Sequence, residues 1–167
     1  MGYLKSVRKE IEKNKDIKIK FIILMFRTGS FFYKKNIVFT LVYLFVKFFY
    51  KLCVEYFLNI ELPLNTKVGF GLKIEHGHGL VVNYNSILGK NVTLKHGVTI
   101  GCKTDLNNSC IRHAILGDNV VVNPTSCVIG VTVGDNVIIG AGSIVVKDVA
   151  ANSVVAGNPA KLIKTIE

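Results

Sequence analysis

Residues 62–145 carry a six-residue repeat, and this period constrains the fold more than any other feature of the chain. An aliphatic residue returns at each step, often followed by glycine, as in Leu88-Gly89. A small or β-branched residue stands four positions after the aliphatic one, as Ser86 does after Val82. This pattern is typical of a parallel β-helix, in which each unit forms one short strand and one corner. The aliphatic positions are Leu62, Val68, Ile74, Val82, Leu88, Leu94, Ile100, Leu116, Val122, Val128, Val133, Ile139 and Val145.

Three interruptions of the repeat indicate where a functional site lies. The first step of irregular length, eight residues instead of six, contains His76 and His78. The second interruption inserts the loop 101–114, which contains His113. The third shortens one step to five residues, over 128–133. A solenoid buries its core by stacking regular coils, so breaks in the period are expected where binding or catalytic loops leave the coil.

The first 60 residues differ from the repeat in charge and aromatic content. Residues 1–61 hold 12 Lys and Arg against 5 Asp and Glu, a net charge of +7, whereas the rest holds 9 against 6. We therefore expect a basic, aromatic and largely helical region over 1–60, followed by a β-helix domain with a C-terminal tail over 61–167. The total net charge of +10 favours anionic partners such as cofactor phosphates or a membrane surface. No aromatic-basic motif of the usual modules is present, so we expect no nucleic acid partner.

The stretch 36–59 is apolar enough to be compared with a membrane span. Lys47, Lys51 and Glu55 interrupt it at intervals of four, which on a helix places them on one face, with Lys51 and Glu55 able to pair. We therefore predict an amphipathic helix that packs on its own domain or another subunit, or lies on a membrane surface. The charged N-terminus does not resemble a secretory signal. These features favour a cytoplasmic protein, at the inner face of the membrane if the helix binds lipid.

Neither the cysteines nor the histidines predict a metal site. The four cysteines are scattered without a CxxC pair, which favours free thiols in a reducing compartment. His78 and His96 are 18 residues apart, one nominal coil, so they could stack. Zinc sites built from histidines across a β-helix interface need three of them, at a tighter spacing than this chain has. We therefore expect no metal.

From about residue 60 to 165 the chain resembles the hexapeptide-repeat acyltransferases. Within them it is most similar to the serine acetyltransferase-like branch, which includes O-acetyltransferases of bacterial polysaccharide synthesis. The matching stretches are IELPLNTKVGFGLKIEHGHGLVV, ILGKNVTLKHGVTIG, RHAILGDNV and VTVGDNVIIGAGSIVVKDVAANSVVAGNPAKLI. The resemblance implies a left-handed β-helix, an exception to the usual right-handed crossover. It also implies acetyl-CoA as donor and a homotrimer with active sites in the clefts between subunits.

The resemblance also assigns roles to individual residues. His76 falls on the family's catalytic histidine, and Glu61 replaces the Asp that orients this histidine. His113 falls on the second active-site histidine, with Arg112 before it as in the family. A neutral imidazole suits removal of a proton from an attacking alcohol, and a carboxylate on its other nitrogen fixes the tautomer. The expected acceptor-binding residues are His78, Arg112 and Asp105, although His78, like His96, could instead be a structural corner residue.

The family binds coenzyme A along its C-terminal coils, and several residues of this chain match those positions. Ala141 matches directly, whereas Pro124 stands where the family usually has Gly-Ala. Lys147 and Lys161 are expected to contact phosphates, unless they are simply solvated surface lysines. The full set of expected coenzyme A contacts is Gly101, Cys102, Pro124, Ala141, Lys147 and Lys161.

We interpret the chain as an acetyl-CoA-dependent O-acetyltransferase whose acceptor is a sugar hydroxyl, free or lipid-linked. The loop 101–113 is rich in side chains that bond hydroxyls, namely Asp105, Asn107, Asn108 and Ser109. The region ahead of the repeat also differs from the long polar helical domain of the serine enzymes, and we find no compact charged pocket for an amino acid. Two alternatives stay open: a serine O-acetyltransferase of cysteine biosynthesis and a non-catalytic β-helix scaffold.

Overall fold

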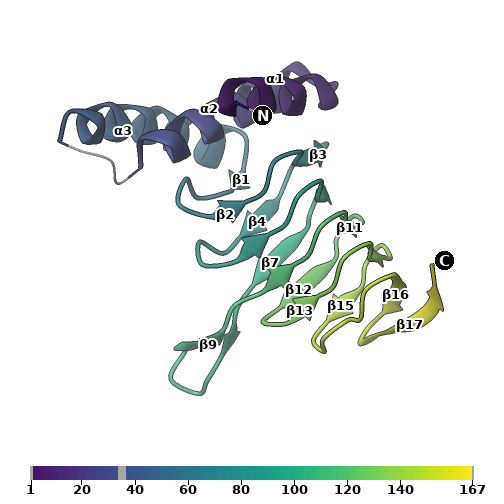
Figure 1. Ribbon diagram of the computed structural model, residues 1–167. Coiled ribbons are helices and arrows are strands. Elements are labelled where there is room, and N and C mark those ends of the chain that lie inside the picture. Colours follow the sequence, from purple (N-terminus) through teal and green to yellow (C-terminus); the bar gives the residue numbers. More distant parts are fainter. Residues whose placement is uncertain (1, 34–36, 167) are drawn as a thin grey trace.

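The computed structural model describes residues 2–33 and 37–166 and consists of a helical end followed by a β-helix (Figure 1). The helical end contains α1 (Tyr3–Lys13), α2 (Ile17–Phe32), α3 (Ile37–Tyr50) and a π-helical turn (Lys51–Phe57) that continues α3. The first strand, β1, begins at Ile60. Asn36, where the predicted amphipathic stretch begins, lies outside the described residues.

Three parallel sheets form the sides of the β-helix, and a separate hairpin leaves one of its corners. Sheet A contains β1 (Ile60–Glu61), β4 (Leu80–Val82), β7 (Thr99–Gly101), β12 (Cys127–Ile129) and β15 (Ile144–Val145). Sheet B contains β2 (Lys67–Val68), β5 (Ile87–Leu88), β10 (Ile115–Leu116) and β13 (Thr132–Val133). Sheet C contains β3 (Lys73–Glu75), β6 (Thr93–Lys95), β11 (Val121–Val122), β14 (Ile138–Ile139), β16 (Ser153–Gly157) and β17 (Ala160–Thr165). The hairpin consists of β8 (Lys103–Thr104) and β9 (Cys110–Arg112).

The chain visits sheets A, B and C in turn, as the coils of a parallel β-helix do. The predicted fold class, a left-handed parallel β-helix with helices at its N-terminal end, is confirmed. The repeat positions identified in the sequence fill its interior. All the aliphatic repeat residues are buried except Val68, which is half-buried in the first coil. Strand β17 departs from the pattern, because it reverses direction and pairs antiparallel with β16. The sequence interpretation described this segment only as a C-terminal tail.

One corner of the β-helix is built from stacked asparagines. Asn91, Asn119, Asn136 and Asn152 all have φ between +55° and +58°, a left-handed conformation that asparagine tolerates better than most residues. The side-chain amides of the first three each donate to the side-chain Oδ1 of the next asparagine, with donor–acceptor distances of 3.2, 2.9 and 2.8 Å along the series. The ladder therefore joins successive coils at the residues that turn the chain.

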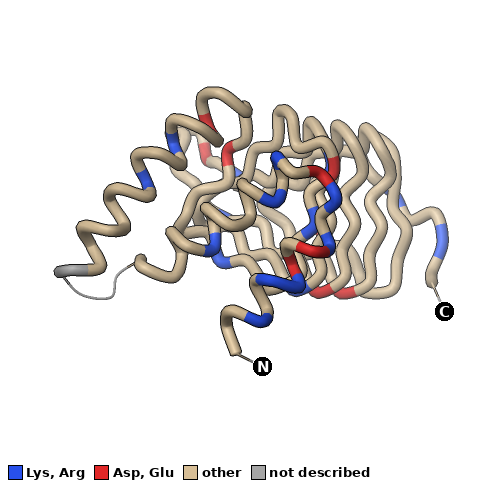
Figure 2. Tube along the Cα trace, turned by 90° about the horizontal axis from the view of Figure 1, so that it is seen from above, with Lys and Arg blue, Asp and Glu red and all other residues tan. Residues whose placement is uncertain are grey.

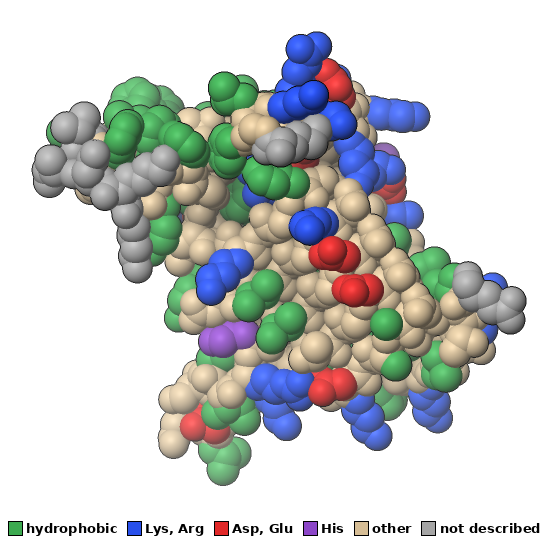
Figure 3. All heavy atoms as spheres, in the orientation of Figure 1, with side chains coloured by type: hydrophobic (Ala, Val, Ile, Leu, Met, Phe, Trp, Pro, Cys, Tyr) green, Lys and Arg blue, Asp and Glu red, His purple; other side chains and the backbone are tan. Residues whose placement is uncertain are grey.

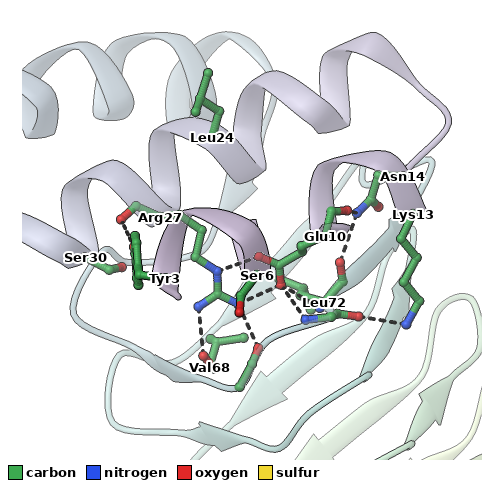
Figure 4. A network of polar contacts seen from close by, with 12 residues as sticks. Tyr3, Ser6, Glu10, Lys13, Asn14, Leu24, Arg27, Ser30, Val68 and Leu72 are labelled. Carbon is green, nitrogen blue, oxygen red and sulfur yellow. Dashed lines mark hydrogen bonds and ion pairs between the residues drawn. The ribbon is translucent and has the colours of Figure 1, made fainter. Parts of the chain in front are cut away.

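Helices α1 and α2 cover the open end of the first coil (Figures 1 and 4). A β-helix must protect this end, because its edge strands would otherwise present unpaired N–H and C=O groups. The carboxylate of Glu10 accepts hydrogen bonds from the backbone N–H groups of Gly71 and Leu72, at 2.9 and 2.7 Å. Asn14 accepts from the N–H of Ile74 and donates to the carbonyl of Leu72. Side chains of α1 thus replace the backbone of a missing coil.

The same end is held by a buried ion pair between the two helices (Figure 4). Arg27 Nε lies 2.6 Å from Glu10 Oε2, and the side chains are 7% and 0% exposed, respectively. The guanidinium also donates to the carbonyl oxygens of Val68 and Gly69. Since a buried charge is tolerated only when it is paired and hydrogen-bonded, these bonds explain how the ion pair is accommodated.

Helix α3 packs against α2 but leaves most of its apolar side chains exposed. Lys47, Lys51 and Glu55 line one groove, as the predicted common polar face requires. Within the described ranges, however, no salt bridge joins Lys51 to Glu55. Both residues lie in the π-helical turn, which has wider turns than an α-helix. Side chains four residues apart are therefore not neighbours there as they are in an α-helix. No helix in the described part of the chain is long and apolar enough to cross a membrane.

Candidate active site

His76 occupies the corner where the chain passes from sheet C to sheet A. It directly follows β3 and is exposed, with φ +65°. A left-handed backbone is uncommon for a residue other than glycine, and such conformations cluster at functional sites. A hydrogen bond within the corner restrains it, because the N–H of His78 donates to the backbone carbonyl of His76 at 2.7 Å. The eight-residue step in the repeat therefore turns one imidazole outward at a rigid corner.

Residues of the later coils continue the same corner along the axis of the β-helix. Gly97 N donates to the carbonyl of His78, and Thr125 N donates to the carbonyl of His96. One coil further, Gly142 N donates to the carbonyl of Pro124. The predicted coenzyme A residues Pro124 and Ala141 therefore lie on the same corner as the predicted acceptor residue His78. The sequence spacing of 18 between His78 and His96 corresponds to one coil, as expected.

Two side chains that the sequence analysis did not select contact the histidine corner or stack near it. The ammonium of Lys18, on α2, lies 3.1 Å from His78 Nε2 and 3.4 Å from the carbonyl oxygen of His76. A lysine ammonium can donate only to a ring nitrogen that carries no hydrogen, so this contact requires the His78 proton on Nδ1. The His96 ring stands edge-on to that of His76, with centroids 6.1 Å apart. Lys18 is some sixty residues away in sequence, so no local motif could have indicated it.

Glu75, next to His76, was also missed. Its carboxylate pairs with Lys73 on the same strand and with Lys95 on the neighbouring strand β6. The hydrogen bond from Lys73, and the charges of both lysines, hold the pKa of Glu75 below its usual value against the opposing effect of desolvation. The sequence did contain a signal for this pair: Lys73 and Glu75 are two residues apart in a predicted strand, so their side chains lie on the same face. The local charge beside His76 is therefore an ionised carboxylate held by two ammonium groups.

Glu61, the predicted partner of His76, lies on sheet A opposite Val81 of the next coil. Its side chain is exposed and lines a pocket of about 460 Å³. Desolvation raises the pKa of nearby Glu55, and the charge of Glu61 adds to this effect while Lys51 opposes it. No hydrogen bond joins Glu61 to His76 in the part of the chain that the structure describes. Catalytic hydrogen bonds are often long in unliganded enzymes and shorten when substrate binds. The orienting role of Glu61 is therefore kept as a prediction.

His113 belongs to a different corner, between sheets A and B, where the β8–β9 hairpin projects away from the coils (Figure 1). Its Nδ1 lies 3.3 Å from the Sγ of Cys110. Cys102, at the opposite base of the hairpin, completes a cluster whose three ligand-type atoms lie within 4.8 Å of one another. Desolvation and a hydrogen bond with the Cys102 side chain raise the pKa of the Cys110 thiol. Gly101, also a predicted coenzyme A contact, ends β7 directly before Cys102.

Arg112 contacts residues of the later coils, whereas Asp105 is engaged within its own loop. Arg112 Nη2 donates to both carboxylate oxygens of Asp148, at 2.7 and 2.9 Å, and to the hydroxyl of Thr132. The hydrogen bond from Arg112 is the main reason why the pKa of Asp148 is lowered. Asp105 Oδ1 accepts from the N–H groups of Asn107 and Ser109, which shapes the loop tip. Contacts of Arg112 and Asp105 with an acceptor stay predictions.

The two predicted active-site histidines are not on the same corner of one chain. His76 lies between sheets C and A, and His113 lies between sheets A and B, one coil and one further sheet A strand along the chain. The predicted phosphate contacts are also divided, because Lys147 follows β15 of sheet A whereas Lys161 lies on the edge strand β17. This separation is what a site shared between neighbouring subunits would require.

Comparison with known proteins identifies relatives with this fold and sequence pattern, although no family model matches the chain. The chain is 31% identical over 107 residues to a protein of Escherichia coli K12 assigned as the colanic acid biosynthesis acetyltransferase WcaB. That match covers 60% of this chain and 66% of WcaB. A serine acetyltransferase of Helicobacter pylori is 41% identical over 64 residues, covering 38% of this chain and 36% of the enzyme.

A solved structure extends the similarity to the helical end. The crystal structure of serine acetyltransferase from Brucella abortus has a TM-score of 0.79, with 24% sequence identity. The match covers 98% of this chain and 69% of that enzyme, so it includes the N-terminal helices as well as the coils. At this identity the likeness establishes the fold of both regions.

Proposed function

Because the chain belongs to the hexapeptide-repeat acyltransferases, we propose that it transfers an acetyl group from acetyl-CoA to a hydroxyl group of a saccharide. The observation that carries this proposal is the histidine corner, where an exposed His76 and the predicted coenzyme A residues Pro124 and Ala141 share one edge. The similarity to WcaB supports the acceptor class, since that protein is assigned to polysaccharide synthesis.

The chemistry follows from what the transfer requires. His76 accepts the proton of the acceptor hydroxyl as its oxygen attacks the thioester carbonyl. Glu61 stabilises the resulting imidazolium and fixes the tautomer of the ring. The tetrahedral intermediate then collapses, the C–S bond breaks, and the thiolate of coenzyme A takes up the proton. No covalent intermediate with the protein is needed.

We also propose that the working form is a homotrimer. The division of His76 and His113 between two corners supports a cleft in which each subunit supplies one of them. Lys147 and Lys161 are divided in the same manner, so the phosphates of one coenzyme A could be bound from two chains.

The test is an acetyl-transfer assay that follows release of free coenzyme A from acetyl-CoA. We expect saturable turnover with nucleotide sugars, oligosaccharides or lipid-linked saccharides, and His76→Ala should lower it by on the order of 100-fold or more. The matched control is His96→Ala, which removes the imidazole 6.1 Å away and should cost much less. Near-normal turnover by His76→Ala would contradict the assignment of the base.

A serine O-acetyltransferase is the second candidate, favoured by the Brucella abortus structure matching 98% of the chain. The helical region differs from the serine enzymes in charge and aromatic content, but its fold is similar, so it no longer argues against serine. Efficient turnover of serine with none on any saccharide would establish this alternative. No acetyl transfer to either class of acceptor would favour the non-catalytic scaffold.

We further propose that the helical end contacts an anionic membrane surface, where a lipid-linked acceptor would be available. Apolar side chains gather over α3 and basic ones over α1 and α2 (Figure 3), and Lys and Arg recur along these helices (Figure 2). Basic residues near an anionic surface contribute about 1 kcal/mol each. Among the described side chains of α3 and the π-helical turn, the most exposed apolar residues are Leu41, Leu44, Phe45, Phe48, Tyr56 and Phe57.

Sedimentation with phosphatidylserine vesicles at low and high salt tests the membrane contact. We expect binding at low salt, release at high salt, and loss of binding in Phe48→Asp. Leu162→Asp is the matched control, because Leu162 is equally exposed but lies on β17 at the other end of the molecule. Absence of binding at low salt would mean that α3 packs on another subunit instead.

A further inference from the structure

The β8–β9 hairpin carries a cluster of two cysteines and His113, none of which takes the proton in the proposed acetyl transfer. Cys102 precedes β8, Cys110 opens β9, and His113 follows it. The register pairs Lys103 with Arg112, so Cys102 and His113 lie directly beyond this pair on opposite strands at the base of the hairpin. The antiparallel pairing thus brings Cys102 to Cys110 and His113, which are three residues apart in sequence.

The dimensions of the cluster fit a tetrahedral zinc site. Zn²⁺ binds thiolate sulfur at about 2.3 Å and imidazole nitrogen at about 2.0–2.1 Å, which places neighbouring ligand atoms roughly 3.5–3.8 Å apart. Cys110 Sγ lies 3.3 Å from His113 Nδ1, and all three ligand atoms lie within 4.8 Å of one another. Small rotations of the side chains would bring them to bonding distance. Two thiolates also neutralise the charge of the ion.

We propose that Cys102, Cys110 and His113 bind Zn²⁺, which fastens the two strands at the base of the hairpin and leaves a fourth position for water. Cysteine and histidine are the ligands that zinc prefers, and three protein ligands with an open position are a common arrangement. The loop held in this way is exposed, and the side chain of Leu106 at its tip is fully accessible to solvent. The metal would therefore order a segment that few other contacts restrain.

This site would change the role of His113 but does not depend on acetyl transfer. A ring nitrogen bound to Zn²⁺ cannot accept a proton, so the base would be His76 alone, and His113 would contribute through the position of its loop. Binding of the metal is measured without acetyl-CoA or an acceptor. Failure of the zinc site would leave the acetyltransferase proposal intact, and the reverse is equally true.

Cobalt substitution on the full-length protein tests the site. After reduction and removal of metal with a chelator, we expect Co²⁺ to give a thiolate charge-transfer band and the intense visible absorption of tetrahedral coordination. Zn²⁺ should displace it at one ion per chain by elemental analysis. Cys102→Ser and Cys110→Ser should each weaken binding on the order of 100-fold or more, at least as much as the loss of an outer-shell partner.

Cys127→Ser is the matched control, because Cys127 is as half-buried as Cys102 but lies outside the cluster. It should bind Co²⁺ as the unchanged protein does. Zn²⁺ should also slow proteolysis within residues 103–109 in the unchanged protein and not in Cys110→Ser. The proposal is overturned if the reduced protein shows no thiolate–cobalt band, or if Cys127→Ser removes it. A band that survives in both Cys102→Ser and Cys110→Ser would likewise reject the site.

Discussion

The helical end and the β-helix protect their backbones in different ways. Each inner coil is bonded to a coil above and a coil below, so its contacts are repeated by its neighbours. The first coil has a neighbour on one side only, and side chains of α1 and α2 supply the bonds on the other. The coils are therefore redundant, whereas the cap depends on a few individual residues. The predictions below test this difference, from the largest expected effect to the smallest.

Glu10→Ala should be the most damaging of these substitutions. It removes the acceptor of the Gly71 and Leu72 N–H groups and leaves Arg27 buried without a carboxylate. Breaking a buried pair by deleting one partner costs about 3–5 kcal/mol of unfolding free energy. Chemical denaturation at fixed protein concentration measures the loss, and hydrogen exchange should show that the amides of Gly71 and Leu72 lose protection first.

Glu12→Ala is the control on the same helix. Glu12 pairs with Arg8 at the surface, where both side chains are largely exposed. Exposed pairs of this kind contribute about 0.3–0.5 kcal/mol. Equal effects of the two substitutions would mean that the cap does not depend on the buried network.

The same difference explains what the sequence could predict. The coils were predictable because each position repeats, so the burial of Leu94 or Val122 follows from the period alone. The docking of α1 and α2 was not, because Glu10 and Arg27 are polar residues on helices and nothing local indicates that they become buried. A charged residue is normally assigned to the surface, and only the open edge of the first coil reverses that preference.

The same contrast between periodic and non-periodic positions applies to the candidate site. His76 was predicted because it interrupts the repeat, and Pro124 because the family resemblance assigns its corner to coenzyme A; the structure places both residues on one corner of the β-helix. Lys18 and Cys110 were not found, since the first reaches the histidines from another element and the second meets Cys102 only through hairpin pairing. Contacts between segments far apart in sequence leave no periodic signal.

Asn119→Ala should produce an intermediate effect that stays local. Asn119 accepts from Asn91 and donates to Asn136, and its φ is +58°. Alanine loses both bonds and is strained in the left-handed region, so we expect a loss of about 1–3 kcal/mol in unfolding free energy. Asn119→Gly loses the bonds but accepts the backbone conformation, so it should cost less. A glycine variant no more stable than the alanine variant would show that the left-handed corner is not what asparagine provides.

Glu75→Gln should have the smallest effect, and one that depends on pH. The hydrogen bond from Lys73, with help from Lys95, lowers the pKa of Glu75 in the folded state below the usual value of 4.5. A lowered pKa means that the ionised carboxylate stabilises the fold above the unfolded-state pKa, and that this contribution disappears as the pH falls through the folded-state pKa. Because the pair is partly exposed, the contribution at pH 7 should be a few tenths of a kcal/mol, and salt should reduce it. Unfolding free energies of both proteins, measured from neutral pH into acid, should therefore differ slightly at neutral pH and converge as the pH falls below 4.5 and through the lowered pKa of Glu75. A difference that persists unchanged in acid would show that Glu75 acts through packing rather than charge, unlike the buried carboxylate of Glu10, whose loss should be far larger at pH 7.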